Sequence, residues 1–292
     1  MNKILVTGGS GFVGRKLIVS LLKRYPESQI TSLSRSEGTI SHLLMDCADP
    51  RLRLEMVDLR DADKVNEVVH DQDVVFHLAA MKRVDLSEEK CQEAVSINVN
   101  GTLNLINAFR GQTFIQMSTD KAVEPVNCYG ATKLIAEKLV MEQAHKYHPG
   151  KRFMIVRGGN IVGSTGSVFD IWKHQISEKN EISVTDLKMI RFYTSVEGVV
   201  ELLITVLDKG KNGTIYLTPH SEPVVLGDLV QEAIKLYGND QTKVRIIGLR
   251  PGERMSEKMF SEVEKSVVVT YETIVSEGND GVAGVPSSQP HF

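Results

Sequence analysis

The first fourteen residues constrain the fold of this 292-residue chain more than any other stretch. The apolar run Lys3–Thr7 predicts a buried strand, and the sequence G-G-S-G-F-V-G follows it from Gly8 to Gly14. An amphipathic helical pattern then continues to Leu22. A strand, a glycine-rich turn and a helix in this order let the backbone approach a pyrophosphate held at the helix N-terminus. The stretch therefore predicts a dinucleotide-binding unit; the alternative is a tight turn without a ligand.

Strands and helices continue to alternate after this unit. Further strands are predicted at residues 29–33, 52–57, 73–78, 112–117 and 152–156, and the longest helical patterns span 89–109 and 128–148. Alternation of this kind produces a parallel sheet with helices on both faces. The predicted fold is therefore α/β, a doubly wound parallel sheet of the Rossmann type.

The regular alternation fails after about residue 163, which predicts a second, smaller α+β substrate domain. Short strands are expected at 182–191, 213–217 and 243–247, and helices at 196–207 and 226–237. We assign residues 1–162 to the dinucleotide-binding domain, with 194–218 returning to it. The substrate domain comprises 163–193 and 219–275, and 276–292 form a flexible tail without periodicity.

Composition excludes several classes of function. The chain is 41% hydrophobic and 24% charged with a net charge of −3, which gives no reason to expect nucleic acid or an anionic membrane as a partner. No apolar run approaches the roughly 20 residues that a membrane span needs. Three widely spaced cysteines, Cys47, Cys91 and Cys128, favour free thiols in a reducing cytoplasm over a disulfide framework or a zinc site. His145 and His148 have no third ligand in view, so we expect no metal site.

Residues 118–133, S-T-D-K-A-V-E-P-V-N-C-Y-G-A-T-K, concentrate reactive side chains. Thr119, Asp120 and Lys121 follow a predicted strand, whose C-terminal edge is where catalytic residues of a parallel sheet gather. Tyr129 and Lys133 are four residues apart, so a helix puts them on one face. An ammonium beside a phenol favours the phenolate, which lets a tyrosine act as acid or base below its free pKa. This half of the stretch predicts oxidation of a hydroxyl.

Ser34 and Arg35 indicate which dinucleotide binds. An enzyme that selects NAD usually has an acid about 20 residues after the glycines. A guanidinium suits a 2′-phosphate, so NADP is favoured over NAD, although Arg35 could also be a solvated loop residue. Asp58 ends a strand and is expected to bind the adenine, to cap a helix, or both. The cofactor-binding candidates are Gly8, Ser10, Gly11, Phe12, Val13, Gly14, Ser34, Arg35, Asp58, Leu59, Leu78, Ala79, Ala80, Lys82, Asn98, Tyr129 and Lys133.

Other polar residues fall at the edges of predicted elements. Lys82 either holds substrate phosphates or is solvated, and Asn98, inside a helical pattern, could organise a water or a nearby lysine. The glycine-rich loop 157–167 and the turn R-P-G-E-R, which contains Arg250 and Glu253, could approach a ligand; the alternative for the turn is an ordinary charged surface loop.

Together these motifs resemble those of the extended short-chain dehydrogenase/reductases. Within that superfamily, residues 1–257 closely resemble the bacterial UDP-N-acetylglucosamine 4,6-dehydratases of the soluble, C5-inverting kind. The segments that carry the resemblance are S-T-D-K-A-V-E-P-V-N-C-Y-G-A-T-K, R-G-G-N-I-V-G-S-T-G-S, T-D-L-K-M-I-R-F and R-P-G-E-R. This chain has Ser256 where the family often has His, and its C-terminal region is short.

The resemblance implies a role for each residue of the central stretch. Tyr129, assisted by Lys133, would remove the proton from the sugar O4 while C4 gives hydride to NADP, and Thr119 would hydrogen-bond O4. Lys121 would be the base at C5 and Asp120 the acid for the departing C6 hydroxyl. Substrate-binding positions are implied at Lys82, Asn160, Arg191, Arg250 and Glu253.

The expected function is thus an NADP-dependent 4,6-dehydratase of UDP-N-acetylglucosamine, with 5-epimerisation, in surface-glycan synthesis. We also expect a cytoplasmic homo-oligomer, a dimer or larger. An alternative keeps the fold but makes the chain a reductase or epimerase acting on an intermediate from a partner enzyme. A non-catalytic NADP sensor is the third alternative, but such proteins usually lose the tyrosine and lysine that this chain retains.

Overall fold

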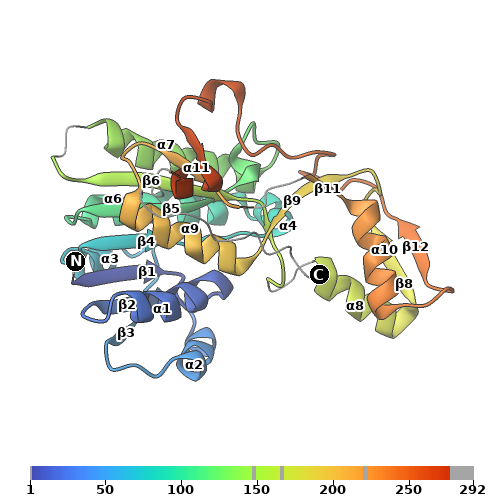
Figure 1. Ribbon diagram of the computed structural model, residues 1–292, viewed down its shortest axis with the longest axis horizontal. Helices are drawn as coiled ribbons and strands as arrows, with labels where there is room; N and C mark the ends of the chain where they lie inside the picture. The colour runs from blue at the N-terminus through green and yellow to red at the C-terminus, as the bar shows by residue number, and fades with distance from the viewer. Residues whose placement is uncertain (1, 147–148, 165–167, 220–222, 277–292) are drawn as a thin grey trace.

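An eight-stranded parallel sheet forms the centre of the computed structural model, which describes residues 2–146, 149–164, 168–219 and 223–276. The strand order is β13-β10-β6-β5-β4-β1-β2-β3 (Figure 1), and every described pairing within this sheet is parallel. Its strands are β1 (Lys3–Thr7), β2 (Gln29–Ser34), β3 (Leu52–Met56), β4 (Val74–His77), β5 (Thr113–Thr119), β6 (Arg152–Gly158), β10 (Ile215–Leu217) and β13 (Val268–Thr270).

Helices cover both faces of this sheet. Those of the main body are α1 (Phe12–Arg24), α2 (Glu37–Asp46), α3 (Ala62–Val69), α4 (Val84–Glu89), α5 (Cys91–Val95), α6 (Gly101–Ala108), α7 (Cys128–His145), α9 (Val196–Lys209) and α11 (Tyr271–Ser276). Shorter turns are the π-helix η1 (Ser96–Asn100) and the 3₁₀ helices η2 (Asp120–Ala122) and η3 (Glu262–Glu264). The predicted doubly wound α/β fold is confirmed.

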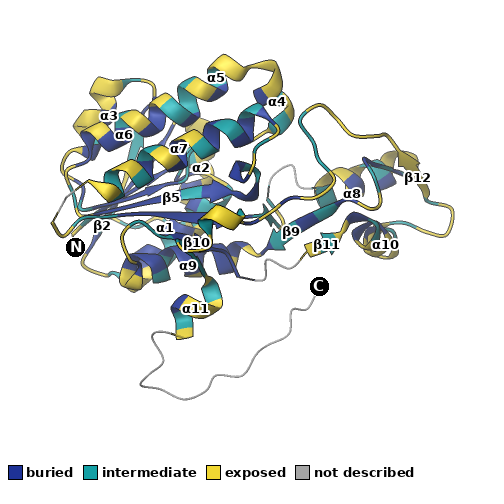
Figure 2. Cartoon of the chain, turned by 90° about the horizontal axis from the view of Figure 1, so that it is seen from above, coloured by how far each residue is buried: buried dark blue, intermediate teal, exposed yellow. Residues whose placement is uncertain are grey.

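The alternation of side chains along each strand explains the two helical layers. Ile4 and Val6 of β1 pack into one apolar core with α1, α2, α9 and α11, whereas Leu5 packs into the other with α3, α6 and α7. Successive residues of a strand point to opposite faces, so a strand covered on both sides reads as a continuous apolar run. Figure 2 shows the buried strands between helices whose outer faces are exposed.

A smaller body lies beside the main one, at the right of Figure 1. It contains β8 (Glu181–Val184) paired with β12 (Lys243–Ile246), and the helices α8 (Val168–Lys179) and α10 (Leu226–Tyr237). Its separate core is built around Trp172, Ile182 and Val230. A third sheet comprises β7 (Asn160–Ile161), β9 (Ile190–Thr194) and β11 (Pro223–Val225), which lies between the two bodies.

Two details differ from the expectations. The helical pattern predicted over 89–109 is interrupted near Lys90, and its centre is the π-helix η1. Residues 268–275, expected in the substrate domain, return to the main body because β13 pairs with β10 and Ile274 of α11 joins the core under α9. The expected helix end at His148 lies outside the described residues. The expected tail 276–292 does so too, apart from Ser276, which ends α11.

Candidate active site

A cavity of about 700 Å³ opens at the carboxyl ends of β1, β2, β4 and β5. The glycine-rich turn forms one wall, and its glycines leave no room for larger residues. Gly8 has a φ of 67°, and a Cβ there would lie 3.0 Å from the backbone of Ala79. A Cβ at Gly14 would lie 2.3 Å from the Gly8 carbonyl oxygen. No side chain caps the N-terminus of α1, so its first amides remain available to an anion.

The cavity brings together nearly all the residues predicted to bind a cofactor. Those in its wall are Gly8, Ser10, Gly11, Phe12, Val13, Gly14, Ser34, Arg35, Asp58, Leu59, Leu78, Ala79, Ala80, Lys82, Tyr129 and Lys133. Asn98 lies outside the described lining. It is buried in η1, where its amide accepts a hydrogen bond from the Met81 N–H at 2.8 Å and donates to the Met81 carbonyl at 3.0 Å. Asn98 therefore fixes the backbone of Met81, which does line the cavity.

One end of the cavity carries hydroxyls and a cation. Ser34 Oγ accepts from the Ser10 N–H at 3.1 Å, and Ser10 Oγ lies 2.6 Å from Thr39 Oγ1. The exposed guanidinium of Arg35 follows directly in the lining. Asp58 is engaged by Arg60 at 2.5 Å, and hydrogen bonds from this guanidinium hold the pKa of Asp58 below its usual range. This end therefore presents hydroxyls and one exposed guanidinium to a ligand.

At the end of β5, Thr119, Asp120 and Lys121 form a compact hydrogen-bonded unit. Thr119 Oγ1 donates to Asp120 Oδ1 at 2.8 Å, and Lys121 Nζ donates to the same oxygen at 3.1 Å. Asp120 is fully buried, whereas the Lys121 side chain is 16% exposed and lines the cavity. The second oxygen, Oδ2, has no hydrogen-bond partner among the described residues. A buried carboxylate oxygen left without a partner is costly. Asp120 itself is not among the residues that line the cavity, which it borders through Thr119 and Lys121.

Tyr129 and Lys133 lie one turn apart on α7, as their spacing predicts. Asn127 caps this helix by accepting from the Gly130 N–H at 2.7 Å. Both side chains line the cavity, and Lys133 Nζ donates to the Met117 carbonyl at 2.7 Å. Burial lowers the pKa of Lys133 to about 8, with Glu137 acting in the opposite direction.

The expected lowering of the tyrosine pKa is wrong for the protein alone. Burial and the negative charge of Asp120 raise the pKa of Tyr129, and a hydrogen bond with Thr119 offsets only part of this increase. Desolvation disfavours the charged form of an acid, and burial is the largest of these effects on the Tyr129 pKa. Tyr129 is therefore a neutral phenol in the ligand-free protein at neutral pH.

The residues implied to bind substrate are divided. Asn160 and Lys82 line the cavity. Arg250 and Glu253 pair with each other at 2.6 Å, and Arg191 donates to the carbonyl oxygens of Ile190, Arg254 and Met255. These three side chains lie outside the described lining, and their charged groups are used within the chain.

Several lining residues carry no sequence signal of their own. The cavity is reached by Leu86 from α4, Lys90 from the junction of α4 and α5, Glu93 from α5, Ile97 from η1 and Ser164 from the loop after β7. Ser118 lines the cavity with a buried hydroxyl that has no partner among the described residues. Its position beside Thr119 at the end of a strand is the signal that could have identified it.

The expectation of three free thiols is wrong for two of them. Cys91 and Cys128 form a disulfide with their Cα atoms 6.0 Å apart, and Cys47 is free. The pair joins the start of α5 to the start of α7, which are 37 residues apart in the chain. The two cysteines are brought together by helix packing, which their spacing in the sequence does not indicate. The cysteines therefore no longer favour a reducing compartment.

Within the described residues, no cluster of three or more histidine, cysteine, aspartate or glutamate side chains could hold a metal ion. Across the same ranges, no helix combines the length and apolar character needed to cross a membrane.

Comparison with known proteins identifies the family. Residues 4–278 match the family model described as polysaccharide biosynthesis protein. The chain is 34% identical over 277 residues to a UDP-N-acetylglucosamine 4,6-dehydratase (inverting) of Campylobacter jejuni, with 93% of this chain and 81% of that protein covered. It is 32% identical over 267 residues to a UDP-glucose 4-epimerase of Rickettsia prowazekii, covering 88% and 77% of the two chains.

The fold comparison agrees. The solved structure of Pen from Bacillus thuringiensis is 33% identical and superposes with a TM-score of 0.85, covering 91% of this chain and 83% of that one. The chain therefore belongs to the polysaccharide biosynthesis protein family, as an enzyme of the short-chain dehydrogenase/reductase superfamily related to the sugar-nucleotide 4,6-dehydratases.

Proposed function

We propose that the protein is an NADP-dependent UDP-N-acetylglucosamine 4,6-dehydratase that also inverts C5. The observation that supports this most is the contact between buried Asp120 and Lys121, whose side chain lines the same cavity as Tyr129 and Lys133. A dehydrogenase that only moves hydride needs the second pair alone. A base and an acid beside the same substrate are what the loss of water requires in addition.

The cradle of glycine backbone and the hydroxyl-rich end with Arg35 fit a bound NADP. When bound, NADP would supply hydride acceptance from C4 and hydride return to C6. Arg35 and the Ser34 hydroxyl would contact the 2′-phosphate, since no carboxylate stands at the end of β2 to bind a free ribose hydroxyl. The amides at the start of α1 would hold the pyrophosphate.

Proton transfer at O4 is assigned to Tyr129. Its Oη would take the O4 proton as C4 is oxidised, with Thr119 hydrogen-bonded to the same oxygen. Burial opposes a negative charge on Tyr129, so the ammonium of Lys133 has to offset that cost. This assigns Lys133 an electrostatic role in the cationic form.

The elimination is assigned to Asp120 and Lys121. A 4-ketone acidifies the C5 proton, which Lys121 Nζ would take in its neutral form. Moving one proton from Lys121 to Asp120 across their 3.1 Å contact gives this neutral amine and a protonated acid together. Asp120 then protonates the C6 oxygen as the C6–O bond breaks and water leaves. Because Asp120 is fully buried, we expect substrate binding to displace Lys121 far enough to open its carboxyl group.

Turnover of UDP-N-acetylglucosamine without added reductant tests the proposal. The expected product is a 6-deoxy-4-keto hexosamine, seen as a new methyl doublet in the proton NMR spectrum while total NADP stays constant. Absence of turnover with every UDP-hexosamine offered would remove the proposal.

The second candidate function is that of an epimerase or a reductase. The similarity to a UDP-glucose 4-epimerase supports this alternative. An epimerase would convert the hexosamine without forming a methyl group. A reductase would consume NADPH stoichiometrically on a keto or unsaturated UDP-sugar and leave the saturated hexosamine unchanged. The same spectra, with the absorbance of NADPH, separate these outcomes.

A further inference from the structure

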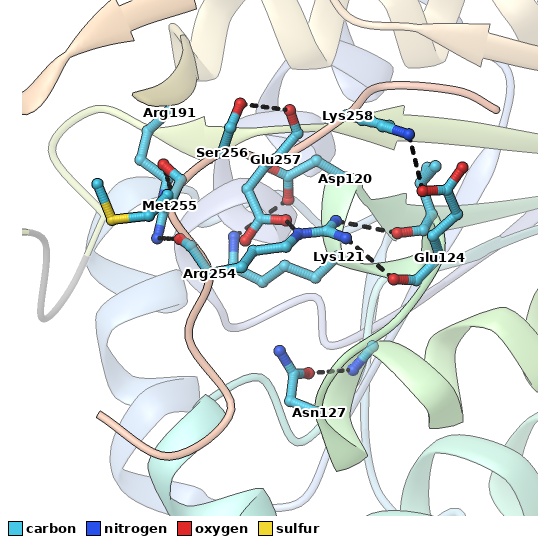
Figure 3. A network of polar contacts seen from close by, with 12 residues as sticks. Asp120, Lys121, Glu124, Asn127, Arg191, Arg254, Met255, Ser256, Glu257 and Lys258 are labelled. Carbon is cyan, nitrogen blue, oxygen red and sulfur yellow. Dashed lines mark hydrogen bonds and ion pairs between the residues drawn. The ribbon is translucent and has the colours of Figure 1, made fainter. Parts of the chain in front are cut away.

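A segment from the far end of the chain packs against the loop that carries the elimination pair. Residues 252–258, here called the C-terminal clamp, lie over residues 120–127, which connect η2 to α7 (Figure 3). Arg254 is the central contact. Its Nη1 donates to the Glu124 carbonyl and its Nη2 to the Val123 carbonyl, both at 2.9 Å. The Val123 N–H in turn donates to the Asp120 carbonyl at 3.1 Å, a hydrogen bond that spans η2.

Arg254 is held at its guanidinium by Glu257 and at its backbone by β9. Its Nε donates to the carboxylate of Glu257, a side chain that is only 4% exposed. The carbonyl of Arg254 accepts from Arg191 Nη2 at 2.8 Å, and the Met255 carbonyl accepts from the Ile190 N–H at 2.8 Å. The clamp is thereby tied to β9. A guanidinium whose three nitrogens all have partners has little freedom to move.

Glu124 shows why the loop needs such support. Its φ is 46°, and it is one of two non-glycine residues in the described chain with a positive φ, the other being Asn180. A residue with a side chain is strained in this region and stays there only when its surroundings enforce it. Arg254 holds the Glu124 carbonyl, three residues after Lys121. A second tie to the same loop comes from Asn127, which donates to the Gly252 carbonyl at 2.8 Å.

We propose that Arg254 is a positioning residue for the elimination, acting by holding the carbonyl oxygens of Val123 and Glu124 so that the turn carrying Asp120 and Lys121 keeps its place beside the cavity. The inference rests on the proposed function, because it assigns to Asp120 and Lys121 the loss of water. No hydrogen bond or ion pair joins Arg254 to either side chain of that pair in the described structure. It acts on the backbone between the elimination pair and Tyr129, and the Tyr129–Lys133 pair keeps its own support from α7.

The variant Arg254→Met removes the three donors and keeps much of the side-chain length. Misplacement of catalytic groups by about 1 Å can cost roughly 100-fold in rate, so we expect water loss to fall by about that factor. Oxidation at C4 should remain within about twofold. A single turnover then accumulates reduced nicotinamide and a 4-keto sugar that retains its C6 hydroxyl. Hydrogen exchange of the amides of residues 120–127 in the ligand-free protein should become faster.

Lys258→Met is the matched control. Lys258 belongs to the same clamp and pairs with the Glu124 carboxylate at 2.8 Å, but both side chains are more than half exposed. Exposed ion pairs contribute little, so this variant should dehydrate and exchange like the wild type. A thermal melt of each variant checks folding, and Arg254→Lys, which keeps the charge, should fall between wild type and Arg254→Met in rate.

Rescue by glycine distinguishes positioning from a general structural effect. Glycine adopts a positive φ without strain, so Glu124→Gly in the Arg254→Met background should recover about tenfold in water loss. If wild type does not dehydrate UDP-N-acetylglucosamine, the proposed function fails, while the exchange data still test the contact. If wild type dehydrates but Arg254→Met dehydrates normally, or loses oxidation and water loss equally, Arg254 is not a positioning residue. A folded double variant without recovery would also contradict the proposal.

Discussion

Lys121 donates to a single oxygen of Asp120, and the other oxygen of that buried carboxylate has no partner in the described part of the chain. Asp120 Oδ1 thus accepts from both Thr119 and Lys121, whereas Oδ2 is a vacant acceptor on a fully buried side chain that is not among the residues lining the cavity. An ion pair retained only for stability would be expected to use both oxygens. The geometry of the pair fits the acid and the base that we propose for the elimination.

Replacing either member should separate the two halves of the reaction. Asp120→Asn and Lys121→Ala are expected to lower water loss by about 10²–10⁴-fold, the usual contribution of a general acid or base. NADP affinity should stay within about twofold of wild type, since neither side chain holds the dinucleotide. Rates by NMR and affinities by titration calorimetry check both statements. Normal dehydration by both variants would show that the elimination residues are misassigned.

Arg35 should determine the preference between the two dinucleotides. Hydrogen bonds to charged groups contribute about 1.5–3 kcal/mol, so Arg35→Ala should weaken NADPH binding about 10- to 150-fold. NADH lacks the 2′-phosphate, and its affinity should change little. Arg60→Ala is a control near the same rim, because Arg60 is occupied by Asp58. An unchanged NADPH to NADH ratio in Arg35→Ala would mean that Arg35 is only a solvated loop residue.

Lys133 should give the ligand-free protein a distinctive pH dependence. Burial lowers its pKa from 10.5 to about 8. Between these values the unfolded chain binds a proton that the folded chain does not, so the free energy of unfolding rises with pH. The slope contributed by this group is at most about 1.4 kcal/mol per pH unit. Urea titrations from pH 7.5 to 10.5 should show this rise in wild type relative to Lys133→Met. Parallel curves for the two proteins would contradict it.

Breaking the buried ion pairs of Arg157 should lower the free energy of unfolding more than breaking an exposed ion pair. The Arg157 guanidinium is fully buried and donates to Glu137 at 2.6 Å and to Glu264 at 2.9 Å, which joins β6 to α7 and η3. Arg157→Met would leave the carboxylate of Glu137 buried without its partner, at an expected cost of about 3–5 kcal/mol in urea unfolding. Lys235→Met, which breaks an exposed pair on α10, should cost less than about 1 kcal/mol. Equal losses for the two variants would refute this difference.

The local part of the site could be predicted from the sequence. The turn at Gly8 needs a positive φ and close backbone contact, and glycine is the residue type that meets both requirements without strain. The four-residue spacing of Tyr129 and Lys133 fixes one helix face once a helix begins at Cys128. The apolar run of β1 follows from a strand covered on both faces.

The non-local part could not be predicted. Arg254 reaches Glu124 across 130 residues of sequence, and nothing in R-P-G-E-R-M-S reports the loop that it meets. The disulfide between Cys91 and Cys128 and the return of β13 to β10 depend in the same way on tertiary packing. The direction of the Tyr129 pKa depends on how much water the fold removes, which a motif does not encode.

The central claim is that hydride transfer and elimination act in series on one substrate. Its most direct test is the conversion of UDP-N-acetylglucosamine in deuterated water, followed by NMR without added reductant. We predict a 6-deoxy-4-keto product that carries deuterium at C5, because the C5 proton is removed and replaced from solvent, and a methyl group that gains no more than the hydride returned from C4. A product without a methyl group, or one whose C5 retains its original proton, would contradict the claim.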